Sequence, residues 1–206
     1  MSGLHGNQLA CGNTAYERKE SDFYPTPPDV TLALLHHLQL PKETVIWEPA
    51  CGEGHMANVF VEQGYLTSAT DLNYQGYGEG GIDFLTAPLP DCNWIITNPP
   101  FNQAENFIRR CAEHKKPFAL LLKSQYWHSK SRLQLFRGIQ PTEVLPLTWR
   151  PDFLFKTRGN GQPVMECLWC VWNGQAEVTY YHPLERPMNI ADHSEQFSLF
   201  VNEGDK

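Results

Sequence analysis

The sequence predicts an α/β fold built on a mainly parallel sheet. Short apolar runs of strand length alternate with helical patterns along the chain, which is the order expected of such a sheet. The chain has 206 residues, 41% of them hydrophobic and 19% charged, which is the balance of one globular domain. A domain of this size buries roughly 70% of its unfolded surface and needs no metal or disulfide to be stable. Collagenous, fibrous and disordered chains are excluded.

The first predicted helix follows a Thr-Pro-Pro sequence. Thr26 is suited to cap it, and Pro27 and Pro28 are tolerated at its first positions because no backbone donor is needed there. Asp29 lies near the positive end of the helix. Its expected apolar face consists of Leu32, Leu35 and Leu38.

Strands and helices then alternate. Strands are predicted over residues 45–47, 66–70, 94–97, 118–122 and 144–147, and helices after Gly54, Asn102 and Ser129. Asn102 and Glu105 have the spacing of a capping box. The helix that they open is expected to bury Phe107, Ile108 and Cys111.

The last part of the predicted domain is an antiparallel hairpin. Residues 165–172 form its first strand, and residues 178–181 pair with them after a turn that starts at Asn173-Gly174. Residues 1–20 and 186–206 are polar and lack periodicity, which predicts a flexible arm and a flexible tail around a domain over residues 21–185.

The six cysteines indicate a reducing compartment. They are scattered without the spacing of a disulfide framework, and the first residues lack the pattern of a secretion signal. A cytoplasmic protein is expected, and no apolar run approaches the ~20 residues of a membrane span. Cys167 and Cys170 have metal-like spacing, but a second pair is missing. We expect two buried thiols on opposite faces of a strand and no metal.

Charge is distributed unevenly along the chain. The net charge is −7, from 16 Lys and Arg against 23 Asp and Glu, which by itself opposes contact with phosphates. The segment from Arg109 to Arg158 holds eleven basic and three acidic residues and carries +8, whereas five basic and twenty acidic residues elsewhere give −15. A localised contact with nucleic acid is therefore compatible with the overall charge.

The first candidate site is the glycine-containing loop from Glu48 to Gly54, between a strand and a helix. Such a loop lets a ligand approach the backbone at the carboxyl edge of the sheet. It lacks the Gly-Lys-Ser/Thr ending of a phosphate loop, and Glu48 and Glu53 would repel phosphate, so a neutral ribose or a cationic group suits it better. Asp71 ends the next strand, where such folds place a carboxylate on ribose hydroxyls. A tight turn and a solvated aspartate are the alternative.

The second candidate site is Asn98-Pro99-Pro100-Phe101, directly after a strand. The two prolines remove two backbone donors and stiffen the loop, so that it presents carbonyl oxygens. The Asn98 amide oxygen and a peptide carbonyl could hold the two N–H bonds of a planar amine, and Phe101 offers a face for a flat ring. An ordinary turn is the alternative.

In this order, the motifs resemble those of the class I S-adenosylmethionine-dependent methyltransferases that modify exocyclic amines. The resemblance is closer to the small phage and prophage DNA adenine-N6 methyltransferases. It runs from Asp22 to about Trp172 and is carried by residues 22–27, 48–54, 71–72, 83–84, 98–101 and 121–123. It implies a Rossmann-like fold, S-adenosylmethionine as cofactor and DNA as partner.

The resemblance also implies residue roles. Tyr24, Pro25 and Thr26 would cover the methionine end of the cofactor. The cofactor's amino acid and ribose would be bordered by loop residues, namely Glu48, Ala50, Cys51, Gly52 and Gly54, and Asp71 would bind the ribose hydroxyls. Asp83 would bind the cofactor adenine amine beside Phe84. The target amine would be held by Asn98 and the Pro99 carbonyl, in the loop that Pro100 stiffens, with Phe101 stacked on the target base.

Larger members of the family carry a separate target-recognition domain. In the present sequence, little of the chain remains for such a domain. Recognition would rest on residues 124–158, where aromatic and basic side chains interleave, as in sites that stack unpaired bases and neutralise phosphates. The expected nucleic-acid-binding residues are Lys123, Lys130, Arg132, Arg150, Lys156 and Arg158, with the aromatic residues Tyr126, Trp127, Trp149, Phe153 and Phe155. A solvated basic face over core aromatic residues is the alternative.

The sequence therefore predicts a site-specific DNA methyltransferase that acts on adenine N6. A methyltransferase of RNA adenine or of protein glutamine is an alternative, because similar loops serve both. A cytosine-N4 target is disfavoured because that group more often has Ser where Asn98 stands. A non-catalytic S-adenosylmethionine-binding or DNA-binding protein is disfavoured because both loops are intact. No pattern predicts the oligomeric state or the recognition sequence.

Overall fold

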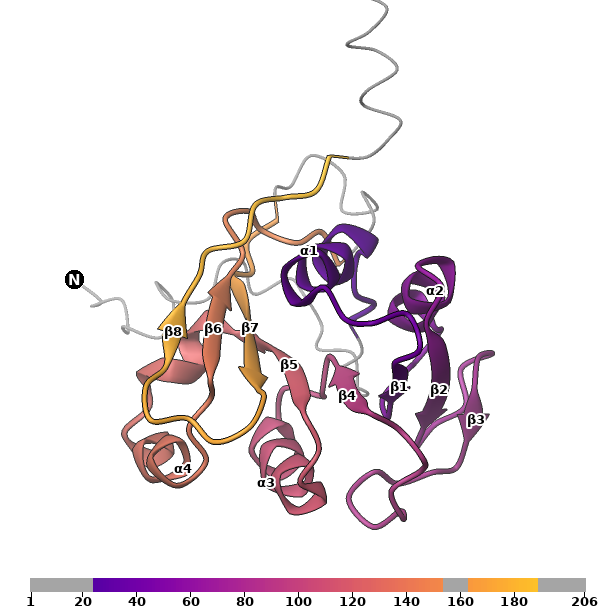
Figure 1. Cartoon of the computed structure of the whole chain (residues 1–206), viewed down its shortest axis with the longest axis horizontal. Helices are drawn as coiled ribbons and strands as arrows, with labels where there is room; N and C mark the ends of the chain where they lie inside the picture. The colour runs from indigo at the N-terminus through magenta and orange to yellow at the C-terminus, as the bar shows by residue number, and fades with distance from the viewer. Residues whose placement is uncertain (1–23, 154–162, 189–206) are drawn as a thin grey trace, which may run out of the picture.

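The computed structural model describes residues 24–153 and 163–188. In this part of the chain an eight-stranded sheet has the order β3-β2-β1-β4-β5-β7-β6-β8 (Figure 1). Helices α1 and α2 lie on one side of the sheet, and α3 and α4 lie on the other. The predicted α/β class and mainly parallel sheet are confirmed. The predicted arm over residues 1–20 and the tail from residue 189 lie outside the described residues.

The parallel half of the sheet is centred on β1 (Val45–Glu48). This strand pairs with β2 (Leu66–Asp71) on one side and β4 (Trp94–Thr97) on the other, and β3 (Glu79–Gly80) and β5 (Phe118–Lys123) extend the arrangement. The carboxyl ends of β1 and β4 therefore flank a topological switch point, where open α/β sheets bind ligands.

The C-terminal strands include the expected antiparallel pairing, but with different partners. β7 (Cys167–Trp172) lies antiparallel between β5 and β6 (Glu143–Pro146). β8 (Tyr180–Tyr181) pairs in parallel with β6, so the predicted hairpin between residues 165–172 and 178–181 is wrong. Because β5 and β6 already occupy both edges of β7, the chain after Asn173 must cross to the outer edge of β6.

Two helices begin without the side-chain caps that the sequence predicts. Pro27 is the N-cap residue of α1 (Pro28–Leu38), and the Thr26 hydroxyl instead accepts a hydrogen bond from Asn98 Nδ2 at 3.1 Å. Gln103 is the N-cap residue of α3 (Ala104–His114), and Glu105 pairs with Arg109 at 2.8 Å instead of closing a capping box. The remaining helical elements are α2 (His55–Glu62), α4 (Leu133–Gly138) and two 3-10 turns, η2 (Ser124–His128) and η3 (Lys130–Arg132).

An apolar cluster covers each face of the sheet. On the first face, α1 buries Val30, Leu34 and Leu35, whereas the predicted Leu32 and Leu38 are only partly buried. The Trp169 indole of β7 donates a hydrogen bond to the Val30 carbonyl at 3.1 Å, which ties this helix to the antiparallel strands. α1 is thereby held over the centre of the sheet.

The second face is covered by α3 and α4. Phe107, Ile108 and Cys111 are buried there, as predicted. Cys167 and Cys170 are both buried and pack into the clusters on opposite faces, which confirms the expectation from strand alternation.

None of the helices in residues 24–153 and 163–188 has both the length and the apolar character needed to cross a bilayer. Within the same residues, no three His, Cys, Asp or Glu side chains are grouped so that they could hold a metal ion.

Candidate active site

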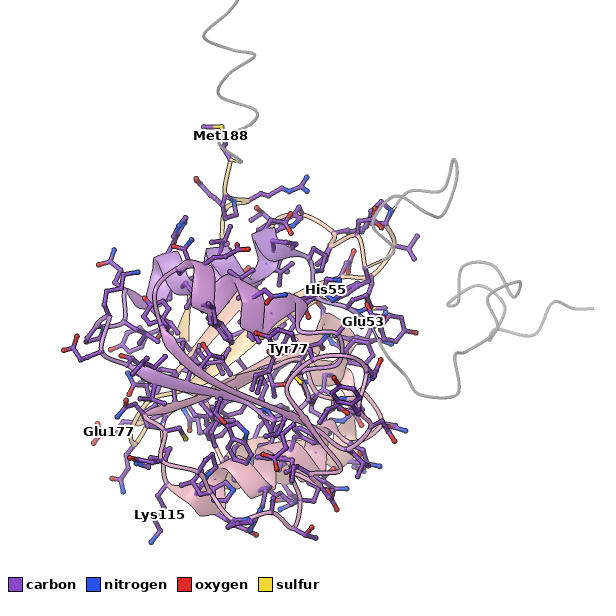
Figure 2. All side chains as sticks on the ribbon, turned by 90° about the vertical axis from the view of Figure 1, so that its right-hand side faces the viewer. Glu53, His55, Tyr77, Lys115, Glu177 and Met188 are labelled. Carbon is purple, nitrogen blue, oxygen red and sulfur yellow. The ribbon has the colours of Figure 1, made fainter. Side chains whose placement is uncertain are left out.

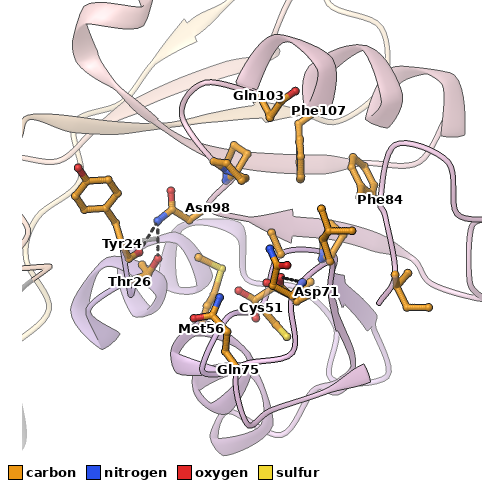
Figure 3. A pocket seen from close by; sticks show the side chains of 18 of the residues that line it. Tyr24, Thr26, Cys51, Met56, Asp71, Gln75, Phe84, Asn98, Gln103 and Phe107 are labelled. Atoms are coloured by element: carbon orange, nitrogen blue, oxygen red, sulfur yellow. Dashed lines mark hydrogen bonds between the residues drawn. The ribbon is translucent and has the colours of Figure 1, made fainter. Parts of the chain in front are cut away.

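A cavity of about 300 Å³ lies at the switch point. Asn98, Tyr24 and Thr26 stand at one end of it and Phe84 at the other (Figure 3). It brings together the two candidate sites and most of their predicted residues: Tyr24, Pro25, Thr26, Glu48, Ala50, Cys51, Asp71, Asp83, Phe84, Asn98, Pro99, Pro100 and Phe101. Gly52 and Gly54 belong to the adjoining loop and do not line the cavity.

Asp71 holds the loop that follows β1. Its Oδ2 accepts a hydrogen bond from the Gly52 N–H and its Oδ1 accepts one from the Asn73 N–H, both at 2.8 Å. The Cys51 N–H also donates to the Thr70 carbonyl at 3.0 Å. Because each carboxylate oxygen can accept more than one hydrogen bond, Asp71 can brace the loop and still accept from a ligand hydroxyl.

Gly54 fits closely against Tyr77, which comes from the loop between β2 and β3. Gly54 has a φ of 80°, and an added Cβ atom would lie 2.3 Å from Cγ of Tyr77. Tyr77 lies beside the segment that carries Glu53 and His55 (Figure 2). The two loops can therefore meet at this distance only because residue 54 has no side chain.

Glu48 is buried at the end of β1, with 2% of its surface exposed. Burial raises the pKa of its carboxyl well above the usual value. A hydrogen bond from the Ala57 backbone N–H lowers this pKa in part, and the nearby Asp71 raises it by a smaller amount. Its Oε2 has no hydrogen-bond partner among the described residues. Burial thus favours the protonated form of Glu48, and its Oε2 is left for a ligand.

Burial also affects the neighbouring thiol. It raises the pKa of Cys51 to about 12, with smaller contributions from the charges of Glu48 and Asp71. A thiol with such a pKa is not a nucleophile at neutral pH. Cys51 therefore lines the cavity as a small apolar residue.

The orientation of the Asn98 amide is fixed by its partners. Its Nδ2 donates to the Tyr24 carbonyl at 3.0 Å and to the Thr26 hydroxyl at 3.1 Å. A carbonyl can only accept, so the amide nitrogen must face Tyr24 and the oxygen must face away. Asn98 Oδ1 is buried in the cavity wall without a hydrogen-bond partner among the described residues. The two hydrogen bonds that the amide nitrogen donates therefore fix the position of Oδ1, the acceptor of the same amide.

Phe101 packs beside Tyr24 and Lys123. The Phe101 and Tyr24 ring centroids are 5.2 Å apart, and Lys123 Nζ lies 3.9 Å from the Phe101 centroid. An ammonium over a ring face is stabilised by about 0.5–2 kcal/mol. Lys123, predicted near the edge of the cleft, thus contacts the very ring expected to stack on a target base, and a base on that face would displace the ammonium.

Asp83 and Phe84 form the far end of the cavity. Asp83 Oδ1 accepts from the Leu85 N–H at 2.9 Å, and the Phe84 ring lies 4.6 Å from that of Phe107. Arg110 holds this loop from α3, because its guanidinium donates to the Ala87 carbonyl at 2.8 Å and to the Phe84 carbonyl at 3.4 Å. One of the basic residues in the +8 segment is therefore used for structure.

The predicted nucleic-acid-binding residues have diverse surroundings. Lys130 is exposed, Arg132 lies over the Tyr126 ring at 3.7 Å, and Arg150 pairs with the Glu166 carboxylate at 2.8 Å. Lys156 and Arg158 lie outside the described residues, as does Phe155.

The predicted aromatic residues are mostly packed against the protein. Tyr126 and Phe153 are buried, Trp149 is partly buried against the core, and Trp127 stacks on Phe136 with centroids 4.1 Å apart. Tyr126 and Phe153 are therefore core aromatic residues, which is the alternative given above for this segment, and their rings cannot stack on bases.

The cavity has further lining residues that the sequence did not single out as site residues. They come from α2, from the loops that follow β2 and β3, and from the start of α3: His55, Met56, Leu72, Asn73, Gln75, Ile82, Leu85, Gln103 and Phe107. Leu72 follows Asp71 in a motif that carries the resemblance, and for the others only their position next to the predicted loops could have indicated them.

Comparison with known proteins supports the fold. No model of a protein family and no curated protein sequence matches the chain. A protein described as a class I S-adenosylmethionine-dependent methyltransferase from Listeria monocytogenes has a similar structure, with a TM-score of 0.59 and 14% identity over 89% of this chain and 73% of its own.

Two further solved structures are similar. A protein described as a modification subunit of a type I restriction enzyme from Vibrio vulnificus has a TM-score of 0.58 and 12% identity, and the match covers 91% of this chain and 54% of that one. One described as an RNA methyltransferase from Pyrococcus horikoshii has a TM-score of 0.56 and 11% identity, over 72% of this chain and 83% of that one. The chain therefore has the Rossmann-like fold of the class I methyltransferases, as its sequence predicts.

Proposed function

We propose that this protein is an S-adenosylmethionine-dependent methyltransferase that modifies the N6 amine of adenine in DNA. The observation that carries the proposal is the Asn98 amide, whose nitrogen is held by Tyr24 and Thr26 and whose oxygen is an unpartnered acceptor in the cavity wall. The fold adds support, because the neighbours include a modification subunit of a restriction enzyme.

The residues around the cavity fit the cofactor. A volume of about 300 Å³ lies at the low end of the range for small-molecule sites. Asp71 stands where a ribose would lie, and Asp83 and Phe84 offer a carboxylate and a ring to an adenine. The buried Glu48 carboxyl would be favoured in its charged form beside a cation. When bound there, S-adenosylmethionine supplies a methyl group on a positively charged sulfur.

The Asn98 loop would prepare the target amine. Asn98 Oδ1 and the Pro99 carbonyl would accept the two N–H bonds of the adenine amine, which draws the nitrogen lone pair out of conjugation with the ring. A nitrogen held in this way would be placed to accept the methyl group, with the electron pair of the broken C–S bond left on the cofactor sulfur. The surplus proton leaves the methylated nitrogen for solvent. Alignment by a fixed loop supplies much of the acceleration, and no base is needed before transfer.

The target base must leave its stack to reach Asn98. Enzymes that modify bases extrude the nucleotide into a pocket and hold it against aromatic side chains. Phe101 would take this role, and the Lys123 ammonium on its ring would move toward a phosphate when the base enters.

The proposal is tested by offering DNA, RNA and protein in parallel to the purified chain with methyl-labelled S-adenosylmethionine. We expect label in DNA, recovered as N6-methyladenine after digestion to nucleosides. Label only in RNA or only in protein glutamine would establish one of the alternative substrates. N4-methylcytosine as the product would overturn the adenine assignment, and cofactor binding without transfer to any substrate would indicate a non-catalytic protein.

A further inference from the structure

A second groove, of about 400 Å³, lies beside the antiparallel strands. η2 forms one wall, and β6, β7 and the edge strand β8 form the rest. Its lining is mainly aromatic and apolar: Ser124, Trp127, His128, Val144, Pro146, Leu168, Thr179, Tyr180 and Tyr181. The proposed methyl-transfer chemistry uses none of these residues.

Tyr181 presents its ring to this groove. It pairs with Val144 in the parallel β6–β8 register, and directly opposed residues point to the same face of a sheet. Val144 packs with the apolar cluster on the α3 and α4 side, on the same face as Trp127. Tyr181 has 66% of its surface exposed, so its position is set by the strand and not by packing in a core.

Tyr180, the preceding residue, also borders the groove, but its side chain points to the opposite face of the sheet. Its ring stacks on that of His182, with an interplanar angle of 22°, and the His182 ring in turn lies 5.4 Å from that of His37 on α1. Tyr180 is 60% exposed, so the two tyrosines are alike in exposure and differ in the face that they occupy. They form a matched pair for mutation.

The opposite wall of the groove is a rigid aromatic platform. The Trp127 indole stacks on Phe136, with centroids 4.1 Å apart and planes 13° apart. Because one face of the indole is fixed by Phe136, its position does not depend on a ligand. A flat ring that entered the groove would meet Trp127 on one side and Tyr181 on the other.

Charge around the groove favours a polyanion. Among the residues that the structure describes, no carboxylate lines it, and η3, which carries Lys130 and Arg132, follows shortly after His128. The groove is also continuous in sequence with the candidate active site, because Lys123 lies over Phe101 and Ser124, the next residue, lines the groove. A strand with one base at Asn98 could thus place another base here.

We propose that this groove is a second nucleobase subsite, which stacks an unpaired base flanking the target adenine between Trp127 and Tyr181. The inference rests on the proposed function, and it deepens it by naming the substrate as DNA with unpaired bases. A paired base cannot enter such a groove, since both of its faces are already stacked in the duplex.

The experiment measures the affinity of single-stranded deoxyoligonucleotides by fluorescence anisotropy, without cofactor and without turnover. Base stacking on an aromatic residue contributes enough that Tyr181→Ala should weaken binding at least about fivefold. Tyr181→Phe, which keeps the ring, should bind like the natural protein, and so should Tyr180→Ala on the other face. Equal affinity for Tyr181→Ala and Tyr180→Ala, or equal weakening by Tyr181→Phe and Tyr181→Ala, would overturn the proposal.

A second arm locates the base. Abasic sites are placed singly on either side of the adenine, and one of them should weaken binding by the natural protein but have no further effect on Tyr181→Ala. Weakening of both proteins to the same extent at every position would contradict a base in this groove.

The binding assay separates the two proposals. If the natural protein methylates no nucleic acid but the Tyr181 pattern is observed, the proposed function fails and the subsite stands. If it methylates DNA and Tyr181→Ala binds normally, the subsite fails and the proposed function stands. Absence of oligonucleotide binding by the natural protein overturns the subsite.

Discussion

Two buried oxygen atoms in the cavity, Glu48 Oε2 and Asn98 Oδ1, lack hydrogen-bond partners among the described residues. Leaving a buried polar atom unpaired costs about 1–3 kcal/mol, so proteins seldom keep such atoms without a use. They lie at the ends of the neighbouring strands β1 and β4 and line the same cavity. At the scale of single residues, this pair is the strongest indication of a ligand site.

The buried Glu48 carboxyl leads to a prediction about stability. Its pKa is raised in the folded protein, so the folded state keeps a proton that the unfolded chain releases near the ordinary pKa of 4.5. The free energy of unfolding should therefore fall, relative to Glu48→Gln, as pH rises from that value through the folded pKa. The slope of the difference is at most about 1.4 kcal/mol per pH unit for one proton.

Urea titrations of both proteins over pH 4 to 8 measure this difference. Glu53→Gln, which removes an exposed carboxylate from the same loop, is the control and should follow the natural protein. A difference between Glu48→Gln and the natural protein that does not change with pH would show that Glu48 is ionised in the folded state.

At the scale of elements, the cavity is shaped by the contact between the loop that precedes α2 and the β2–β3 loop. Gly54 begins α2, and the Tyr77 ring from the β2–β3 loop packs directly on it. Gly78 makes a similar contact, since a Cβ atom there would lie 2.5 Å from the Ala69 carbonyl oxygen. Both glycines have positive φ, so neither position suits a larger residue.

This contact predicts a difference between two glycine substitutions. Gly54→Ala adds a methyl group 2.3 Å from Tyr77, whereas Gly81→Ala, with a similar φ of 78°, meets none of the described residues within 4 Å. Both variants bear the cost of an alanine at positive φ, about 1 kcal/mol, and only Gly54→Ala should also displace Tyr77.

We expect Gly54→Ala to weaken S-adenosylmethionine binding at least tenfold by calorimetry, and Gly81→Ala to leave it unchanged. The double variant Gly54→Ala with Tyr77→Ala should recover part of the loss, because the clash is then removed. Equal cofactor affinity in the two glycine variants would show that the loop contact does not shape the site.

The sequence predicts buried elements well and edge elements poorly. Residues 94–97 were predicted as a strand with its observed bounds, because a central parallel strand is apolar throughout. β3, with two residues at a sheet edge, has no periodicity that a pattern could reveal. β8 lies within the predicted strand over residues 178–181, but an edge strand of two residues does not indicate its partner, and the predicted pairing with β7 is therefore wrong. Tyr77 was missed for a related reason, since its role depends on a contact between distant loops.

The capping errors have a similar origin. Thr26 and Asn102 are residue types that cap helices locally, but the Thr26 hydroxyl is used by Asn98, which lies far away in sequence. The gathering of the predicted residues around one cavity could be predicted, because most of them follow strand ends and a parallel sheet brings its strand ends to one edge.

At the scale of the whole molecule, charge limits how the protein can meet DNA. The net charge is −7, and several basic residues of the +8 segment are bound to the protein itself, such as Arg110 to the Phe84 loop and Arg150 to Glu166. The contact with phosphates should therefore be small, with affinity depending only modestly on salt.

Salt dependence can be tested with two lysines. Lys130→Gln near the groove should weaken DNA binding and reduce the slope of log affinity against log salt by about 0.7 to 0.9, the value for one phosphate contact. Lys115→Gln changes an exposed lysine at the C-terminal end of α3, which lies away from Tyr77 (Figure 2), and should change neither. Identical slopes for both variants would show that the phosphate contact does not involve Lys130. In both variants the affinity for the cofactor should be unchanged.

The proposed role of Asn98 in holding the target amine is tested by mapping methylated bases in cells. The natural protein, Asn98→Ala and the exposed-turn control Asn173→Ala are expressed in a host that lacks adenine methylation, and modified bases are mapped at single-nucleotide resolution. We expect N6-methyladenine at a defined sequence with the natural protein and with Asn173→Ala, and none with Asn98→Ala, although purified Asn98→Ala still binds S-adenosylmethionine. Methylation that persists in Asn98→Ala would contradict the claim that this amide holds the target amine.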